Sequence, residues 1–291
     1  MIRRLPMLTA ILVAAAVLLP TGRARAADPA SDDKLCEVET TKDLTYCDGD
    51  DADKDKHKLD LYLPKGKKDF PVVMFVHGGG WIFGDRNFFG IYEDIGQMFA
   101  RHGIGAVVIS YRLSPHVMHP EHIKDVAAAF AWTHKHIGDY GGRADQLFVC
   151  GQSAGGHLGA LLGTDESYLQ AEGLSLKDVK GVMPVSGVYE LLDGYFNEVF
   201  GKDPEKRKQA WPRTHVHEGC PPFFIAYGDK DYPFCDVASE EFCRALRKEK
   251  VSAETMKFKG HDHFNEVVKM GMDDDAMAQA LCKFVMDHIK E

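Results

Sequence analysis

The 291-residue sequence predicts an α/β protein with a mostly parallel central sheet and helices on both faces. Continuous apolar runs rich in β-branched residues, such as PVVMFVH (71–77) and IGAVVISY (104–111), are typical of strands covered on both faces. Segments with helical spacing alternate with these runs. A repeated strand–helix–strand order brings successive strands parallel, so the pattern favours a doubly covered sheet.

The elements follow from local patterning. HKLDLYLP (57–64) alternates apolar and polar positions, which predicts an edge strand exposed on one side. The first helix is expected to stop at Gly103, and the second to begin just after Pro120. The remaining predicted strands are 71–77, 104–111, 146–151, 179–187, 221–229 and 252–260, and the predicted helices are 88–101, 121–137, 154–163, 236–250 and 275–290.

Residues 1–26 have the features of a signal peptide. Two arginines precede an apolar run at 8–19, and Ala24-Arg25-Ala26 forms a small-x-small cleavage site. The run is short for a bilayer span, although a retained N-terminal anchor is the alternative. The segment therefore predicts export to the periplasm or the extracellular medium, with no stable membrane insertion after cleavage.

Removal of this segment leaves one α/β domain. An acidic N-terminal segment, 27–56, precedes the domain at 57–291. Loss of the four arginines of residues 1–26 lowers the net charge from −9 to about −13. Such a charge argues against nucleic acid or anionic lipid as a partner, and nothing in the sequence indicates the oligomeric state.

Seven cysteines in an exported chain allow disulfides but leave at least one thiol unpaired. Cys36 and Cys47 flank a short polar segment and form the first expected pair. Cys235 and Cys243 form the next, with Cys282 as a competitor for either. Cys150 lies in an apolar run and is expected to be a buried thiol.

One segment interrupts the alternation. Residues 188–220 carry several aromatic side chains among charges and are too long for an ordinary connection. They are expected to form either a small cap or lid beside a binding site or a structural excursion.

The strongest chemical motif is VCGQSAGGHLGALL, which places Ser153 in a G-x-S-x-G pentapeptide between a strand and a helix. Glycines at 151 and 155 relieve the crowding of so sharp a reversal, and the serine oxygen is exposed at the sheet's carboxyl edge. The helix that starts at Ala154 directs free N–H groups to the same point. Ser153 is therefore the predicted nucleophile.

A glycine run at 78–80 follows a buried strand. Acyl transfer builds negative charge on a carbonyl oxygen, and backbone N–H groups can approach that oxygen only where side chains are missing. The run therefore predicts an oxyanion hole made by Gly79, Gly80 and Ala154. His77 is expected to brace this loop without transferring a proton. A plain glycine-rich turn is the alternative.

A serine nucleophile needs a base and an orienting acid, which this topology supplies after later strands. FFIAYGDKDYPF offers Asp229 and Asp231, and MKFKGHDHFNEV offers His261 and His263. The residues alone leave both choices open.

The motifs HGGGW, GQSAGGHL, GDKD and GHDHF together resemble the α/β-hydrolase esterases, in particular the HGGGW carboxylesterase branch that includes arylformamidase-like and isoprenylcysteine methylesterase-like enzymes. ISYRLSP and YGGRADQLFVCGQSAGGH are similar to that branch as well, and the resemblance runs from about His57 to His288. It implies the α/β-hydrolase fold with a small cap insert. It also implies that Asp231 is the acid and that His263, directly before a phenylalanine, is the base.

Other candidate side chains have competing interpretations. His157 is expected to pack or to form hydrogen bonds along the helix after Ser153. His116, His119 and His122, like the group His261-Asp262-His263, suggest a metal, but a solvated loop is preferred for the first group and no metal or other cofactor is expected. Trp81 and Phe83 either line an acyl pocket and bind substrate or pack the glycine loop.

The sequence thus predicts an exported serine carboxylesterase that hydrolyses small to medium acyl esters, free or linked to a polymer. An amidase or arylformamidase with the same three residues is the second hypothesis. A catalytically silent hydrolase fold used for binding is the third.

Overall fold

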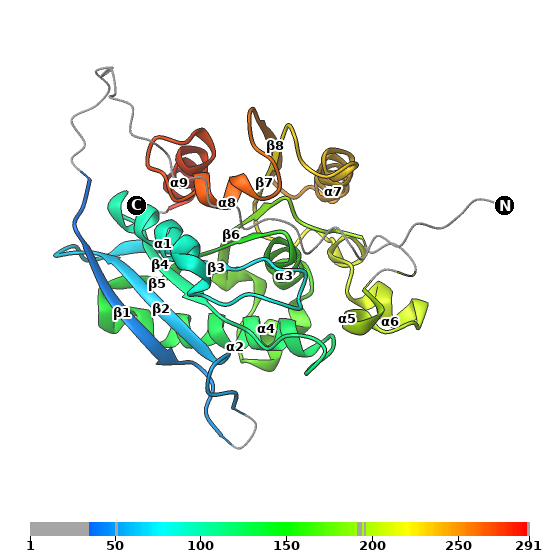
Figure 1. Ribbon diagram of the computed structural model, residues 1–291, viewed down its shortest axis with the longest axis horizontal. Coiled ribbons are helices and arrows are strands. Elements are labelled where there is room, and N and C mark those ends of the chain that lie inside the picture. The colour runs from blue at the N-terminus through cyan, green and yellow to red at the C-terminus, as the bar shows by residue number, and fades with distance from the viewer. Residues whose placement is uncertain (1–34, 50–51, 191–193, 195, 290–291) are drawn as a thin grey trace. The chain divides into compact units, whose positions relative to one another are not determined.

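A computed structural model of the chain describes residues 35–49, 52–190, 194 and 196–289. Its centre is an eight-stranded sheet in the order β1-β2-β4-β3-β5-β6-β7-β8 (Figure 1). β1 and β2 are antiparallel, as are β2 and β4, and all other pairs are parallel. The strands are β1 (Val38–Thr45), β2 (Lys58–Pro64), β3 (Phe70–Val76), β4 (Gly105–Ile109), β5 (Gly142–Gln152), β6 (Val179–Val185), β7 (Phe223–Gly228) and β8 (Ala253–Phe258).

Helices cover the sheet on both sides (Figure 1). They are α1 (Ile91–Arg101), α2 (Glu121–His136), α3 (Ala154–Leu162), α4 (Glu166–Ala171), α5 (Asn197–Phe200), α6 (Pro204–Gln209), α7 (Cys235–Lys248), α8 (Asn265–Lys269) and α9 (Ala276–His288). Short 3₁₀ helices lie at η2 (Phe88–Gly90), η3 (Ile137–Tyr140), η4 (Leu176–Asp178) and η5 (Pro212–His215). The mostly parallel sheet and the order of its main elements confirm the predicted fold class.

The two faces of the sheet carry separate apolar cores. Along β3, Val72, Met74 and Val76 belong to one core, and Val73 and Phe75 belong to the other. The first core includes the apolar side chains of α2, α3 and α7, and the second includes those of α1 and α9. Because alternate residues of a strand point to opposite faces, each buried strand must be apolar throughout, which is the pattern that the sequence shows.

The strand at 58–64 is not an edge strand, and that prediction is wrong. β1 covers it on one side and β4 on the other, and all its residues except the first are buried. Asp60 accounts for the misleading polar position, because this fully buried carboxylate binds the Arg86 guanidinium at 2.9 Å. A paired charge can occupy a buried position that an unpaired one cannot.

The expected disulfides do not form, since all seven cysteines are free. Cys36 and Cys47 lie beyond opposite ends of β1, whose eight residues span about 27 Å at the usual rise of a strand. Cys235 and Cys243 both lie on α7, about 12 Å apart along its axis. A disulfide requires Cα atoms less than about 7 Å apart, so neither pair can close. Cys150 is fully buried, as predicted.

The segment 188–220 holds α5, α6 and η5, and its described residues pack against the sheet domain. The Tyr189 ring stacks on Phe242 of α7 with centroids 4.3 Å apart, and Ala210 accepts a hydrogen bond from His157 of α3 at 2.7 Å. Movement of this segment as a lid stays a prediction.

The signal-like segment 1–26 lies outside the described residues. Within the part of the chain that the structure describes, no helix is both long and apolar enough to cross a bilayer.

Candidate active site

The carboxyl ends of the parallel strands carry the predicted site residues. Ser153 follows β5 and is the first residue before α3, with φ +56° and ψ −115°. A positive φ is strained for a serine, and here it forms the tight turn that reverses the chain between strand and helix. Gly155 is required beside it, because a Cβ at that position would overlap the carbonyl oxygen of Val76 on β3.

The glycine loop after β3 lies against this serine. A Cβ on Gly78 would come 3.5 Å from the Cβ of Ser153. Gly79 adopts φ +107°, and a Cβ there would overlap the carbonyl oxygen of Phe83, so only glycine fits. Among the described residues, no group accepts a hydrogen bond from the backbone N–H of Gly79, Gly80 or Ala154. Free N–H groups beside a serine are the arrangement that an oxyanion requires.

Three predicted side chains meet at this edge, and we call them the Ser153–His263–Asp231 relay. His263 Nε2 lies 2.9 Å from Ser153 Oγ, and His263 Nδ1 lies 2.8 Å from Asp231 Oδ1. A carboxylate can only accept, so Nδ1 carries the ring proton and donates a hydrogen bond to Asp231. Nε2 is then free to accept the proton of the Ser153 hydroxyl. The geometry matches that of a nucleophile, a base and an orienting acid.

The Asp231 carboxylate is held in its ionised form. Burial alone would raise its pKa, but hydrogen bonds and the charge of His263, together with the donors Ser186 and Tyr232, lower the pKa to about 2. The Tyr232 backbone N–H donates to Oδ1 at 2.6 Å, and the Ser186 hydroxyl contacts Oδ2. Asp231 is therefore a charged acceptor with both oxygens engaged.

The rival acid and base lie elsewhere. Asp229 accepts a hydrogen bond from the backbone N–H of Gly260 at 2.6 Å and so orders the loop after β8. The His261 ring is buried and lies 3.0 Å from the Asp275 carboxylate. The structure thus brings Asp231 and His263 to Ser153, and leaves Asp229 and His261 in neighbouring loop contacts.

The remaining histidines are packing groups. His77 is fully buried, binds the carbonyl oxygen of Gly78 at 2.7 Å and stacks on Tyr111, so it braces the glycine loop as predicted. Burial lowers the pKa of His77 to about 4, so its ring is neutral at pH 7. His157 packs in the core and donates to a backbone carbonyl, also as predicted.

The solvated-loop interpretation of residues 116–122 is only partly correct. His116 is exposed and His119 is half-buried, but His122 is buried and contacts the Ser114 hydroxyl at 3.1 Å. His122 begins the inward face of α2, and burial lowers its pKa to about 4.

Trp81 and Phe83 have different environments. Trp81 is 2 % exposed, and its ring packs edge-on against His157, Phe196 and Phe200 at centroid distances of 4.9 to 5.2 Å. It therefore packs the glycine loop onto α3 and the 188–220 segment. Phe83 is 44 % exposed and remains available to a substrate.

Three polar residues of the site escaped the sequence analysis, namely Gln152, Ser186 and Glu266. Gln152 donates to the backbone carbonyl of His263 at 2.9 Å and to Glu266 Oε1 at 2.7 Å. Ser186 contacts both Asp231 and Glu266. The signal available for Ser186 was its place directly after β6, between the strands that precede Ser153 and Asp231. Glu266 follows His263 by three residues, but nothing in the sequence shows that it is fully buried.

Within the described residues, one group of ligand-type side chains lies at metal-binding separations: Asp231, His263 and Glu266, whose atoms are within 4.8 Å of one another. These groups are already engaged in the hydrogen bonds of the relay and of Ser186. The grouping is therefore explained without a metal ion.

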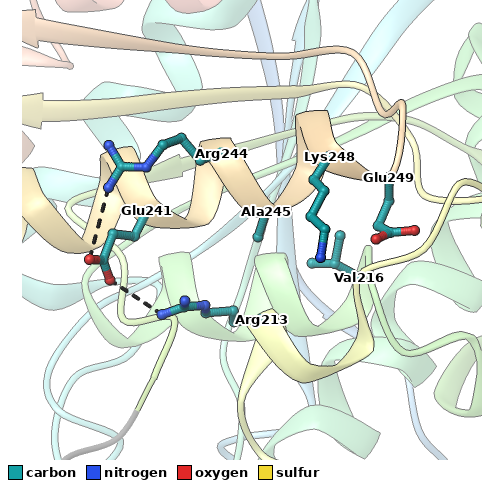
Figure 2. A pocket seen from close by; sticks show the side chains of 7 residues that line it. All are labelled: Arg213, Val216, Glu241, Arg244, Ala245, Lys248 and Glu249. Carbon is teal, nitrogen blue, oxygen red and sulfur yellow. Dashed lines mark hydrogen bonds and ion pairs between the residues drawn. The ribbon is translucent and has the colours of Figure 1, made fainter.

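A surface hollow lies between the outer face of α7 and the segment around η5 (Figure 2). In Figure 2, Glu241 lies between Arg213 and Arg244, with nitrogen–oxygen distances of 3.3 and 3.9 Å. None of the predicted site residues lines this hollow. Exposed ion pairs of this kind contribute little to stability.

Solved structures of other proteins share this fold. A truncated carbohydrate esterase from gut microbiota superposes with a TM-score of 0.74 at 19 % identity, covering 89 % of this chain and 98 % of that one. Esterase B from Lactobacillus rhamnosis superposes with a TM-score of 0.71 at 22 % identity, covering 90 % and 87 %. The fold is therefore that of an α/β-hydrolase.

The sequence identifies the family within this class. Residues 59–246 match the BD-FAE family model, and the chain belongs to that family. A probable isoprenylcysteine alpha-carbonyl methylesterase of Arabidopsis thaliana is 29 % identical, over 73 % of this chain and 49 % of the relative. Esterase LipC of Mycobacterium tuberculosis is 31 % identical, over 65 % of this chain and 52 % of the relative. The chain spans about half the length of these curated relatives.

Proposed function

We propose that the protein is a serine carboxylesterase that hydrolyses small to medium acyl esters through a covalent acyl-enzyme. The observation that carries the proposal is the continuous set of contacts from Ser153 Oγ through His263 to Asp231, at 2.9 and 2.8 Å. Beside it lie backbone N–H groups that have no acceptor among the described residues. Esterases among both the relatives and the similar folds support it.

The proposed reaction begins at the serine. His263 Nε2 takes the proton of Ser153 as its oxygen attacks the ester carbonyl carbon. Asp231 keeps the ring proton on Nδ1 and stabilises the imidazolium that forms. The N–H groups of Gly79, Gly80 and Ala154 stabilise the negative oxygen of the tetrahedral intermediate.

The two halves of the cycle mirror each other. His263 returns its proton to the leaving alcohol as the carbon–oxygen bond breaks, and an acyl-Ser153 remains. His263 then takes a proton from water, which attacks the acyl carbon, and returns it to Ser153 Oγ as the acid leaves.

The test compares the wild type with Ser153→Ala on p-nitrophenyl acetate and butyrate. We expect turnover to fall by about 10⁴-fold or more, because the nucleophile is lost while the binding groups stay. A fluorophosphonate probe should label the wild type and not the variant. Full turnover by a pure Ser153→Ala preparation would refute the proposal, and failure to label an active wild type would refute the acyl-enzyme.

A substrate panel separates the ester from the amide hypothesis. N-formyl anilines should be cleaved far more slowly than the p-nitrophenyl esters if the chain is an esterase.

Export is a further part of the proposal that depends on residues 1–26 alone. Expression of the full chain should then yield a processed, exported protein, and retention of residues 1–26 in a cell-bound product would contradict it.

A further inference from the structure

A second carboxyl group lies directly behind the relay. Glu266 of α8 is fully buried, and its Oε2 lies 2.7 Å from the Ser186 hydroxyl. The same hydroxyl contacts Asp231 Oδ2, the oxygen that does not face His263. Ser186 therefore bridges two carboxyl groups, one of which belongs to the relay.

The number of protons fixes the roles in this bridge. A serine hydroxyl has one proton to donate, and an ionised carboxylate can only accept. Two hydrogen bonds from Ser186 to two carboxylates would need two protons. One of the carboxyl groups must therefore be protonated and must donate to the Ser186 oxygen.

The surroundings assign that proton to Glu266. Asp231 accepts hydrogen bonds from His263 Nδ1–H and from the backbone N–H of Tyr232, both of which favour its ionised form. Among the described residues no cationic side chain forms an ion pair with Glu266, and its other oxygen accepts a hydrogen bond from Gln152 at 2.7 Å. Burial, together with the charges of Asp231 and Asp262, raises the pKa of Glu266 to about 8 despite the hydrogen bonds of Gln152 and Ser186.

We propose that Glu266 is a protonated positioning residue. Its carboxyl O–H donates a hydrogen bond to the Ser186 oxygen, so that the Ser186 O–H donates a hydrogen bond to Asp231 Oδ2. This inference rests on the proposed function. The chain of hydrogen bonds from Glu266 through Ser186 to Asp231 holds Oδ2 of Asp231 in place. It thereby directs Oδ1 of Asp231 toward His263 Nδ1. It also keeps a second negative charge away from the imidazole at neutral pH.

Ionisation of Glu266 should disturb this arrangement. The titratable groups that face it are Asp231 from the loop after β7, Asp262 and His263 from the loop after β8, and Cys235 at the start of α7. Burial and the charge of Asp231 raise the pKa of Cys235, so its thiol stays neutral when Glu266 titrates. Above about pH 8, Ser186 faces two carboxylates with one proton, and we expect kcat to fall about three- to tenfold.

The decisive variants are Glu266→Gln and Glu266→Ala. Glutamine copies the protonated acid, because its oxygen can accept from Gln152 and its amide can donate to Ser186. At pH 7, kcat for p-nitrophenyl acetate should stay within about threefold in Glu266→Gln and fall by about tenfold or more in Glu266→Ala, with KM changed less than about twofold. The alkaline fall of kcat should be absent in Glu266→Gln.

Difference infrared spectroscopy tests whether the Glu266 carboxyl group is protonated, without measuring enzyme activity. The wild-type minus Glu266→Gln spectrum should contain a protonated carboxyl band at about pH 6 that is lost at about pH 9.5. Glu240→Gln on α7, whose carboxylate binds Tyr227 and Thr255 away from the relay, is the matched control and should alter neither kcat nor this band.

Several results would overturn the proposal. An ionised carboxylate band for Glu266 at about pH 6 would overturn it. So would a kcat in Glu266→Gln as low as that in Glu266→Ala, or a wild-type kcat in both variants. If Glu266→Ala does not fold, Ser186→Ala replaces it and should lower kcat by about tenfold at similar KM. Full turnover by Ser153→Ala would defeat the esterase mechanism instead, while the infrared result would still report on Glu266.

Discussion

The glycine loop at 78–80 and the loops that carry Asp231 and His263 both face Ser153, yet they hold their functional groups by different means. The glycine loop presents main-chain N–H groups, fixed by positive φ angles of +107° at Gly79 and +59° at Gly80. The loops after β7 and β8 present side chains whose orientation depends on hydrogen bonds among titratable groups.

This difference has consequences for how each side responds to change. The N–H groups of the glycine loop do not titrate, and its buried His77 is already neutral at pH 7. Next to His263 the pKa values of two neighbouring carboxyl groups move apart, to about 2 for Asp231 and about 8 for Glu266. A substitution in the glycine loop should therefore lower kcat by a steric effect that is the same at every pH. A substitution at Asp231 or Glu266 should have an effect that depends on pH.

The largest effect is expected from Asp231→Asn. The amide can no longer fix the proton on His263 Nδ1, and the wrong tautomer leaves Nε2 unable to accept from Ser153. Steady-state kinetics on p-nitrophenyl acetate should show kcat lowered by about 10⁴-fold at unchanged pH. Asp229→Asn is the matched control, since Asp229 binds only the neighbouring loop, and it should lower kcat by less than about threefold. Equal losses in the two variants would show that the acid has been assigned wrongly.

The next largest effect is expected from Gly79→Ala. The added methyl group would overlap the carbonyl oxygen of Phe83, so the loop must shift and carry its N–H groups away from the oxyanion. Loss of such a donor costs about 10² to 10³ in kcat, and the loss should be the same across the pH range.

Gly66→Ala provides the control for backbone strain. Gly66 also has a positive φ, +73°, but no atom lies within 4 Å of the position of a Cβ. This variant should lose about 1 kcal/mol of unfolding free energy and keep its kcat. A pH-dependent loss in Gly79→Ala would contradict the separation between the two sides of the site.

The same contrast explains what the sequence could predict. Backbone demands leave a visible pattern: the glycines around Ser153, the run at 78–80 and the buried apolar strands all follow from sterics. The positions of Asp231 and His263 at strand ends follow from the topology. The sequence alone left two acids and two bases possible, and the family resemblance selected the pair that the structure places beside Ser153.

The wrong predictions of an edge strand and of disulfides, and the missed role of Glu266, also have a common cause. A buried charge such as Asp60 looks like an exposed position until its partner Arg86, 26 residues away, is known. Cysteine pairing depends on distances that the strand β1 and the helix α7 impose. The link from Glu266 through Ser186 to Asp231 joins helix α8 to the loops after β6 and β7 and depends on burial. Nothing local in the sequence specifies long-range contacts of these kinds.

The third prediction concerns the pH dependence of stability in Glu266→Gln. The pKa of Glu266 is raised on folding, so the folded wild type binds a proton between about pH 4.5 and about pH 8 that the unfolded chain does not. The free energy of unfolding of the wild type should therefore fall, relative to Glu266→Gln, by a few kcal/mol as the pH rises through this range. Urea unfolding at a series of pH values measures it. A constant difference between the two proteins would mean that Glu266 does not titrate in this window.

The smallest effect, and the opposite sign, is expected from the neighbouring carboxylate. The pKa of Asp231 is lowered on folding from 3.8 to about 2, so it stabilises the fold above about pH 4 and loses this contribution as the pH falls towards 2. Relative to Asp231→Asn, the wild type should gain about 2 kcal/mol of unfolding free energy between about pH 2 and pH 5. Two carboxyl groups joined by one serine would then respond to pH in opposite directions. If both variants shifted the stability profile in the same direction, the proton could not be shared as the contacts of Ser186 require.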